Sequence, residues 1–548
     1  MSTNEHLHPL EAPAYCAILC TLCALLFVFG APAGGAFSWP DSPRHALNGA
    51  FVMDLVRAAP MSDLKGYAYN YYSQYPALTI LFYPPLFYVL LAPFYAVLGV
   101  SQETALFVIF LCYALFAWGT FFFARLWLAP VLSLAVALVL VTAPEVTYWG
   151  RQVMLEIPAF AFLVWSAYFF VRHIREERIG WLYLSVALLI LGAYTKLSVV
   201  FVAAPYAITL VAHRGASFFR DRNTYIIAAA AAVAMAPLIY LTLNFGQANV
   251  QSVTGLADAA VSRRSLEGWL WYARKLPGQI GWPALVAAIV FVFAKPVLRH
   301  RSTGIHTATF LLSWLIVGYV FFSAIDLKEE RHSIFLLLPV AMAVGFSASL
   351  IFERSPRWAA VSAIAIGLMT LSITLFTRPV HYVRGYEAVV DYVSRHAPQY
   401  SNVMFSGYRD GAFIFNMRAR SHRPDLRVLR ADKMLLQISV RRSLGVGQRT
   451  YTEAEIGNLI SAMGVHYVVA QPDFWTDLDQ MARLQSVLRG AQFEEVTRFP
   501  MLANYNAQEK LLIVYRNLGQ VNKDPVTITN EIPMLNMNVI EGKPPATN

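Results

Sequence analysis

Residues 104–124 read TALFVIFLCYALFAWGTFFFA, a run that contains no charged side chain. An α-helix rises about 1.5 Å per residue, so a run of this length spans roughly the 30 Å of hydrocarbon in a membrane. A helix that is apolar on every side is buried in a large core or in lipid. This stretch therefore predicts a membrane-spanning helix, and further stretches like it decide the fold class.

Ten other segments have a similar apolar character, which brings the predicted spans to eleven. They lie near 14–37, 104–124, 129–149, 156–171, 181–194, 197–212, 224–243, 283–297, 307–325, 333–351 and 358–377. The first is not preceded by Lys or Arg, and no convincing cleavage site follows it, so we expect a retained helix rather than a signal peptide. The expected fold class is a mostly α-helical polytopic membrane protein with a C-terminal soluble α/β domain.

The composition agrees with a membrane protein, and the charged residues are distributed unevenly between the two parts of the chain. Hydrophobic residues make up 57% and charged residues 14%, against about 25% charged in soluble domains, and the mean hydropathy is +0.48. Residues 1–377 hold 40 charged side chains and the shorter segment 378–548 holds 36. A disordered protein, a disulfide scaffold and a purely cytosolic enzyme are therefore excluded. Nothing in the net charge of +10 calls for nucleic acid.

The four cysteines all lie in apolar segments of the first part of the chain. Cys16, Cys20 and Cys23 share one helix face, and Cys112 lies in the run quoted above. No His or acidic residue joins the stripe, so we favour packing or lipid contact over a metal or redox role. The C-terminal domain has no cysteine and is expected to fold without disulfides.

Loop charges predict the orientation. With a cytoplasmic N-terminus, the inside connectors total 42 residues with 12 Arg or Lys, and the outside ones total 120 residues with 11. This bias matches the positive-inside rule. A further apolar run, Phe82–Gly99, carries Pro84, Pro85 and Pro93 and would invert the later loops if it crossed the membrane. We therefore expect a re-entrant or surface-lying helix on the outer face.

This arrangement predicts two long loops on the outer side of the membrane, residues 38–103 and 244–282. Long loops without structure of their own are usually functional. Within the first, Arg44–Ala59 is expected to form an amphipathic surface helix, with Ser42 as the N-cap and Pro43 at the first helical position.

We divide the chain into a transmembrane domain (1–377), an outer soluble domain (378–522) and an extended tail (523–548). Alternating elements in the soluble part suggest a small α/β layer domain. Predicted strands are 403–406, 411–415, 466–470 and 511–515, and predicted helices are 386–396, 453–463 and 478–488.

No Walker loop, HExxH, GxSxG or CxxC motif is present, so the chemistry must be sought among charges at the ends of spans. Four clusters lie there, all on the outer side. They are Trp39–His45 with Asp41 and Arg44, Arg151–Pro158 with Glu156, Thr195-Lys196, and Asp326–His332 with Lys328 and Arg331.

Each cluster also has an ordinary structural interpretation. Asp41 would cap the following helix, and Glu156 would be a negative charge that stabilises the N-terminus of its helix. Lys196 would extend its amine from a tight turn to the membrane surface, and the charges of the last cluster would simply be solvated. Together, however, they place two carboxylates and several cations beside an apolar cavity. This suits a sugar carried on a polyprenyl phosphate, because cations stabilise the leaving phosphate and a carboxylate can act as general base.

The sequence also resembles a known family. Asp41-Ser-Pro-Arg44-His45-Ala-Leu-Asn48-Gly, Tyr83-Pro84-Pro-Leu-Phe-Tyr88, Arg151 to Pro158, Tyr194-Thr-Lys196 and Arg331-His332 are similar to segments of GT-C fold glycosyltransferases. The nearest groups are family 39, which includes protein mannosyltransferases, and the aminoarabinose transferases. The resembling stretches are scattered through about the first 340 residues.

The resemblance implies roles for these positions. Asp41 and Glu156 would be the catalytic acidic pair, and the same two would hold a divalent metal if one is needed. The donor phosphate would lie near Arg44, Arg151, Lys196, Lys328, Arg331 and His332. His45, Tyr83, Pro84 and Tyr88 would line the cavity.

The sequence departs from the family at two places. Ser42 follows Asp41 where protein mannosyltransferases usually have a second acid, and Phe82-Tyr83 stands where aminoarabinose transferases commonly have Glu-Lys. The first departure argues against a protein as the acceptor. The second departure argues against lipid A as the acceptor, and it also removes a residue that would be expected to bind a metal.

The predicted function is therefore an inverting glycosyltransferase of a bacterial plasma membrane. It would transfer one sugar, a hexose or a pentose, from a polyprenyl-phosphate donor to an acceptor hydroxyl or lipid phosphate on the outer face. The main alternative is a polytopic transporter or lipid flippase, which would also show many spans and charges. A third reading is a non-catalytic assembly or receptor protein.

Overall fold

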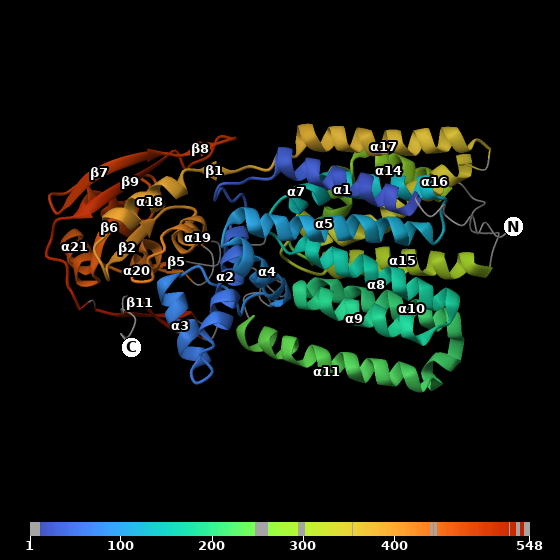
Figure 1. Ribbon diagram of the computed structural model, residues 1–548, viewed down its shortest axis with the longest axis horizontal. Coiled ribbons are helices and arrows are strands. Elements are labelled where there is room, and N and C mark those ends of the chain that lie inside the picture. The colour runs from blue at the N-terminus through green and yellow to red at the C-terminus, as the bar shows by residue number, and fades with distance from the viewer. Residues whose placement is uncertain are drawn as a thin grey trace.

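The computed structural model describes residues 11–246, 261–293, 302–352, 354–438, 442, 446–524, 526–532 and 537–541. A long helical bundle and a smaller domain of strands and helices lie end to end (Figure 1). Three helices lie between them, namely α2 (Ser42–Ala58), α3 (Leu64–Gln74) and α4 (Leu86–Leu98). We call the end of the bundle that faces the smaller domain the domain-side end.

Eight helical segments of the described chain are long and apolar enough to cross a membrane. They are α1 (Glu11–Gly30), α5 (Gln102–Arg125), α8 (Glu156–Glu176), the continuous η1, α10 and η2 (Leu197–Arg220), α11 (Arg222–Phe245), α15 (Ser302–Ser323), η4 (Glu330–Leu336) with α16 (Leu337–Phe352), and α17 (Pro356–Thr377). The bent pair α6 (Pro130–Thr142) and α7 (Pro144–Gly150) supplies a ninth. Two shorter apolar helices, α9 (Ile179–Thr195) and α14 (Trp282–Phe293), complete the bundle.

All eleven predicted spans therefore correspond to helix in the described chain, and the predicted fold class is confirmed. Two boundaries differ. The first span ends at Gly30 rather than near residue 37, because bends and turns follow that glycine. The last four residues of the predicted span 283–297 lie outside the described residues.

The bend between α6 and α7 has a local cause. Ala143 adopts an extended conformation (φ −53°, ψ 135°), which a residue before proline prefers, and Pro144 then starts a new helix. α7 consequently turns by 66° from α6. The turn places Glu145 and Trp149 at the domain-side end, where they join the site described below.

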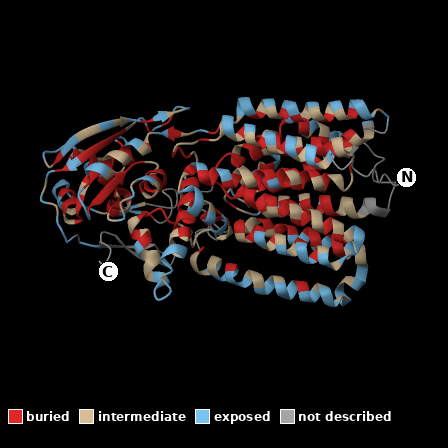
Figure 2. Cartoon of the chain, viewed as in Figure 1, coloured by how far each residue is buried: buried red, intermediate tan, exposed pale blue. Residues whose placement is uncertain are grey.

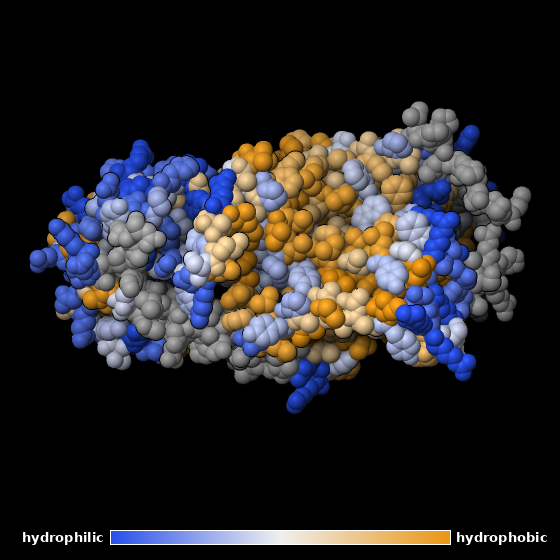
Figure 3. Space-filling model, turned by 60° about the horizontal axis from the view of Figure 1, so that its bottom comes forward, coloured by the Kyte–Doolittle hydropathy of each residue, from blue (hydrophilic) through white to orange (hydrophobic). Residues whose placement is uncertain are grey.

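Apolar side chains form a hydrophobic band on the bundle. Figure 3 shows it on one face, between the polar soluble domain and a polar opposite end. Several described basic residues lie at that opposite end, in the last turns of α8 and α10 and in the segments that follow them, namely Arg172, Arg175, Arg178, Arg214 and Arg220. The buried side chains gather inside the bundle and within the soluble domain, whereas α11 and α17 are largely exposed (Figure 2). This distribution fits helices packed side by side in lipid.

The run 82–99 forms α4, which begins after Pro85. At about 1.5 Å per residue its length is roughly 20 Å, too short to cross the hydrocarbon core. α4 packs against α2 and α5 at the domain-side end.

The prediction of a helix near Arg44–Ala59 is confirmed as α2, but two details were wrong. Asp41, not Ser42, stands at the N-cap position, and its side chain makes no capping hydrogen bond. The helix is not a surface helix either, because Ala46, Leu47 and Ala50 are fully buried under α4 and the soluble domain. The carboxylate of Asp41 is therefore not used as a helix cap.

The soluble domain contains a five-stranded sheet with the order β3-β2-β6-β9-β7. β2 (Asn402–Ser406) is parallel to both β3 (Arg427–Arg430) and β6 (Val465–Ala470). β9 (Leu511–Asn517) is antiparallel to β6 and to β7 (Phe493–Pro500). Small antiparallel pairs join β1 (Val383–Arg384) to β8 (Leu502–Ala503), β4 (Leu436–Ile438) to β5 (Val446–Gln448), and β10 (Ile528–Ile532) to β11 (Met537–Glu541). The segment predicted as an extended tail thus contains a pair of strands.

Helices cover both faces of this sheet. α18 (Tyr386–His396) and α19 (Asp410–Arg420) share a core with Val403 and Phe405 of β2. α20 (Ala431–Leu435), α21 (Glu453–Ala462) and α22 (Asp479–Leu488) share another with Met404. The predicted strand at 411–415 was wrong, because these residues lie in α19. A short apolar run has no periodicity that separates a buried strand from a buried helix.

The core on the α18 and α19 side continues into the outer loop of the bundle. Phe37, Ala46 and Leu47 belong to the same cluster as Val389 and Phe413. The two parts are also joined by ion pairs and hydrogen bonds, such as the two-fold contact of Arg418 with Asp54 at 2.6 and 2.8 Å. The soluble domain is therefore docked firmly on α2 rather than tethered by a linker.

Candidate active site

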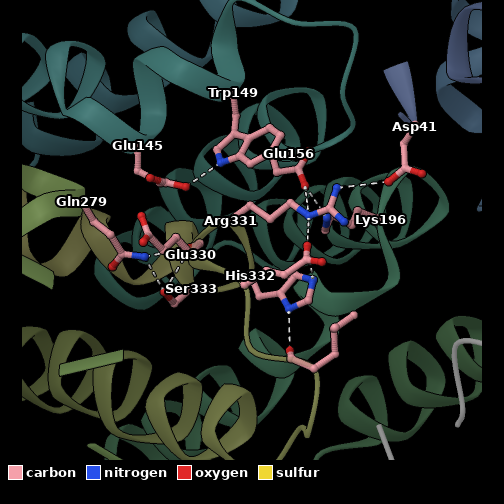
Figure 4. A network of polar contacts seen from close by, with 12 residues as sticks. Asp41, Glu145, Trp149, Glu156, Lys196, Gln279, Glu330, Arg331, His332 and Ser333 are labelled. Atoms are coloured by element: carbon pink, nitrogen blue, oxygen red, sulfur yellow. Dashed lines mark hydrogen bonds and ion pairs between the residues drawn. The ribbon is translucent and has the colours of Figure 1, made fainter. Parts of the chain in front are cut away.

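Four of the predicted side chains meet in one network at the domain-side end (Figure 4). Arg331 lies at its centre, with Nη1 3.3 Å from Asp41 Oδ2 and Nε 3.8 Å from Glu156 Oε1. Lys196 Nζ donates a hydrogen bond of 2.7 Å to the same Glu156 oxygen. Asp41, Glu156, Lys196 and Arg331 are separated along the chain by 115, 40 and 135 positions, so the fold brings them together.

Each of these side chains comes from the end of a helix. Asp41 precedes α2, Glu156 is the first residue of α8, Lys196 follows α9, and Arg331 lies in the first turn of η4. Backbone groups at helix ends lack intrahelical partners, which leaves such positions polar within an apolar bundle. The network consequently lies where the membrane part meets the outer loops.

Glu156 is the most deeply buried member, with 0% of its surface exposed. Its Oε1 faces Lys196 and Arg331, whereas its Oε2 is buried and has no hydrogen-bond partner among the described residues. A buried carboxylate oxygen without a donor costs free energy, so this atom is ready to accept a hydrogen bond from a bound molecule.

Asp41 is held in its charged form. Burial alone would raise the pKa of Asp41, but Arg331, His45 and Arg44 outweigh it and hold the pKa below its ordinary value. Burial lowers the pKa of the nearby His45 to about 4. At neutral pH the site therefore offers an ionised Asp41 beside a neutral imidazole.

Two tryptophans lie side by side against the guanidinium of Arg331. Its central carbon lies 5.3 Å from the ring centre of Trp39 and 5.5 Å from that of Trp149, and the two rings meet edge to face at 5.3 Å. Trp149 in turn donates a hydrogen bond of 2.6 Å to Glu145. Such contacts fix the plane of the guanidinium and keep water from one side of it.

Glu329 is a functional candidate that the sequence interpretation left among the solvated charges of its cluster. Its carboxylate lies 2.5 Å from Arg331 Nε and 3.7 Å from His332 Nε2. His332 also lies 3.2 Å from the carbonyl oxygen of Leu327. An anionic group thus already contacts the cation that was predicted to bind phosphate.

The chain is similar to proteins of known family and structure. Residues 83–241 match the family model described as dolichyl-phosphate-mannose-protein mannosyltransferase. ArnT from Cupriavidus metallidurans bound to undecaprenyl phosphate superimposes with a TM-score of 0.62 at 13% identity, over 93% of this chain and 98% of that one. This chain has the GT-C fold. No curated protein sequence matches it significantly.

Two other GT-C structures are similar over most of this chain. Arabinofuranosyltransferase AftD from Mycobacteria gives a TM-score of 0.53 at 15% identity, over 94% of this chain and 40% of that one. The Archaeoglobus fulgidus oligosaccharyltransferase gives 0.55 at 10% identity, over 92% and 76%. At identities this low, the structural similarity establishes the shared fold alone. Evidence for the chemistry comes from the residues of the site.

Three residues that were predicted to contact the donor phosphate lie outside the network around Arg331. Arg151 donates to the carbonyl oxygens of Thr147 and Arg378, at 3.0 and 2.8 Å. Lys328 donates to the carbonyl oxygen of Ser323. Arg44 pairs with Asp410 of the soluble domain at 3.0 Å. The structure thus gives these three cations partners of their own.

The predicted cavity-lining residues gather around His45. Its Nδ1 lies 2.9 Å from the hydroxyl of Tyr88, and its ring meets that of Tyr83 edge to face at 4.7 Å. Pro84 follows Tyr83 in the turn before α4. These residues form one wall next to Asp41, and their role in lining the cavity stays a prediction.

A second acidic network lies behind Trp149. Arg378, where the chain leaves α17, contacts both Glu145 and Glu330, and Lys275 lies 3.0 Å from Glu330. Sequence reasoning missed this network, since Glu145 lies inside an apolar run and Arg378 more than 200 residues away. It fixes Trp149 and η4, and therefore Arg331, in position.

A divalent metal does not fit this arrangement well. The described residues include no group of three or more His, Cys, Asp or Glu side chains that could hold one. The predicted ligands Asp41 and Glu156 both contact Arg331, whose positive charge would repel a metal ion placed between them. We therefore derive no step through a metal, and its involvement stays a prediction.

Proposed function

We propose that this chain is an inverting glycosyltransferase that takes one sugar from a polyprenyl-phosphate donor. The single observation that carries the proposal is the network of Arg331, Lys196, Glu156 and Asp41, two cations and two carboxylates at the boundary of an apolar bundle. The GT-C fold supports it, since ArnT, which has this fold, was solved with undecaprenyl phosphate bound.

The donor phosphate would bind to Arg331 and Lys196. In the transfer step the bond between the sugar C1 and the phosphate oxygen breaks, and the released polyprenyl phosphate gains a negative charge. Cations fixed beforehand in a site of low dielectric stabilise this charge strongly. The planar guanidinium of Arg331, which packs on Trp39 and Trp149 along one side, is suited to contact two phosphate oxygens at once.

Asp41 would act as the general base. As the acceptor oxygen bonds to C1 on the face opposite the phosphate, its proton passes to the Asp41 carboxylate. Arg331 keeps this carboxylate ionised before the donor binds. A phosphate that shares Arg331 would weaken its hold on Asp41 and make the carboxylate a stronger base. Glu156 would position the acceptor or the sugar through its free Oε2.

The orientation is also part of the proposal. The basic connectors gather at the end of the bundle opposite the soluble domain, which supports a cytoplasmic location for that end. The soluble domain and the active site would then face the outside of a bacterial plasma membrane. The acceptor is a hydroxyl, or a lipid phosphate, on that side.

The direct test is to identify what lipid the purified protein carries and what it transfers. We expect mass spectrometry of lipids extracted from detergent-purified protein to find a polyprenyl phosphate or its sugar-linked form. Incubation with radiolabelled polyprenyl-phosphate sugars and a membrane extract should then release polyprenyl phosphate. A protein that moves lipid between the leaflets of a vesicle but transfers no sugar would be a flippase instead.

Glu329 gives a second test of donor binding. Its carboxylate occupies Arg331 and His332, so an incoming phosphate must displace it. We expect Glu329→Gln to bind undecaprenyl phosphate roughly three- to tenfold more tightly in a quantitative binding assay, because a competing anion is removed. Glu267→Gln, an exposed change on α13 (Leu266–Ile280), is the matched control. Weaker binding in Glu329→Gln would show that Glu329 assists the donor.

A further inference from the structure

A small cleft lies between the active site and the soluble domain. It measures about 240 Å³ with its open mouth, and it is lined on one side by Trp39, Pro40 and Pro43 and on the other by Tyr408 to Ala412. The first group flanks Asp41 in the sequence. A molecule in this cleft would therefore contact the soluble domain and the residues on either side of Asp41 in the chain.

The soluble side of the cleft is the carboxyl end of the parallel strands. Tyr408 follows β2, and Gln471 to Trp475 follow β6, its parallel neighbour. In open α/β sheets, ligands usually bind at this edge. Here the edge faces α2, because the N-terminus of α19 packs on Pro43 and Arg44.

A chain of aromatic contacts begins at Tyr408, which lines the cleft. The ring of Tyr408 meets Phe474 edge to face at 5.0 Å, and Phe474 stacks on Trp475 at 4.5 Å. Phe474 is buried, whereas Tyr408 and Trp475 are partly exposed. Trp475 has a φ of 50°, a backbone conformation that is rare for a large side chain and that tends to occur at functional sites.

Charged groups accompany these rings. Arg442 lies over the ring of Trp475 at 5.6 Å and pairs with Asp477. At the cleft, Asp410 lies between Arg44 and Arg430, at 3.0 and 2.7 Å. Hydroxyl groups can donate to such carboxylates and accept from such guanidinium groups.

From this arrangement we infer that the soluble domain binds the acceptor, and that the acceptor is a saccharide. Its sugar rings would lie on Trp475 and Tyr408, and its terminal hydroxyl would reach Asp41 through the cleft. The inference rests on the proposed function, since it assigns the acceptor side of that reaction. No part of it requires the donor to be a particular sugar.

The residues around the cleft favour a saccharide over a peptide as the acceptor. A pyranose has an apolar face of C–H groups that packs on aromatic rings, and a rim of hydroxyls that needs polar partners. An extended peptide is commonly bound by pairing with an open sheet edge. β2 and β6, which end at the cleft, are inner strands with a neighbour on both sides, so they offer no such edge.

Saturation-transfer NMR on the detergent-purified full chain tests the inference, with a panel of methyl pyranosides and short oligosaccharides as probes. We expect at least one probe to bind the wild type. Trp475→Ala and Tyr408→Ala should weaken it by roughly tenfold, as truncation of a central aromatic contact does. Trp475→Phe, which keeps a ring, should retain most of the binding. Tyr382→Ala is the matched control, because Tyr382 is partly exposed and also lies under an arginine, at 4.7 Å from Arg384.

The outcomes separate this inference from the proposed function. The inference is overturned if no saccharide binds, if Trp475→Ala and Tyr408→Ala bind as well as the wild type, or if a Ser/Thr-rich peptide binds in place of the saccharides. Binding of undecaprenyl phosphate is measured on the same samples. It should be unchanged in the Trp475 and Tyr408 variants, and its absence in the wild type would contradict the donor proposal while leaving the saccharide site intact.

Discussion

Asp41→Asn is expected to lower the rate of sugar transfer by roughly 10²–10⁴, the usual cost of losing a general base. The amide keeps the size of the side chain but cannot take a proton from the acceptor. Binding of undecaprenyl phosphate should be retained, because Arg331 still has Glu156 and Glu329 as partners. Single-turnover transfer with excess enzyme, measured beside donor affinity, separates the two effects.

Asp63→Asn is the control for this variant. Asp63 lies in the same long outer loop but caps α3, where it accepts a hydrogen bond from Gly66 N. Its replacement should leave transfer near the wild-type rate. If Asp41→Asn kept more than about a tenth of wild-type transfer, the base would have to be another group, and Glu156 would be the next candidate.

Arg331→Gln is expected to produce the second large loss, of roughly 10²–10³ in kcat/KM with weaker donor binding. The change removes the central cation and leaves Asp41, Glu156 and Glu329 to repel one another and the phosphate. Such a variant can also be less stable, because buried charges are left unpaired. Arg331→Lys keeps the charge and should fold normally, yet it should still bind the donor less tightly, since lysine lacks the planar fork.

Arg274→Met serves as the control for charge removal, because Arg274 is exposed on α13 and its pair with Glu267, at 3.9 Å, is exposed as well. Thermal unfolding of each variant shows which losses come from instability. Unchanged affinity for undecaprenyl phosphate in both Arg331 variants would contradict the phosphate role, whatever happened to the rate.

Much of the fold could be predicted from the sequence because lipid imposes a simple requirement. A chain segment in hydrocarbon must satisfy its backbone within a helix, so apolar length alone located the spans. The soluble domain was harder. Residues 411–415 are apolar on all sides because α19 lies between the sheet and α2, and such burial removes the alternation that separates helix from strand.

The site could be predicted only in part for a related reason. A charge in an apolar chain signals that it has a partner but does not say which one. Lys196 and Arg331 turned out to face Glu156, whereas Arg151 faces the backbone of Arg378 and Arg44 faces Asp410. These partners lie tens to hundreds of residues away, and only the packing of helices brings them into contact. Glu329 was overlooked because its neighbours in sequence are also charged.

The core shared by α2 and the soluble domain limits how such proteins can diversify. If the domain were exchanged alone for that of a relative, Phe37, Ala46 and Leu47 would face a surface that had not evolved to cover them. A chimera with a new acceptor range would therefore need α2 and the loop before it to be transferred together with the domain. New specificities would be inherited as a two-part unit, even though its parts are more than 300 residues apart in the chain.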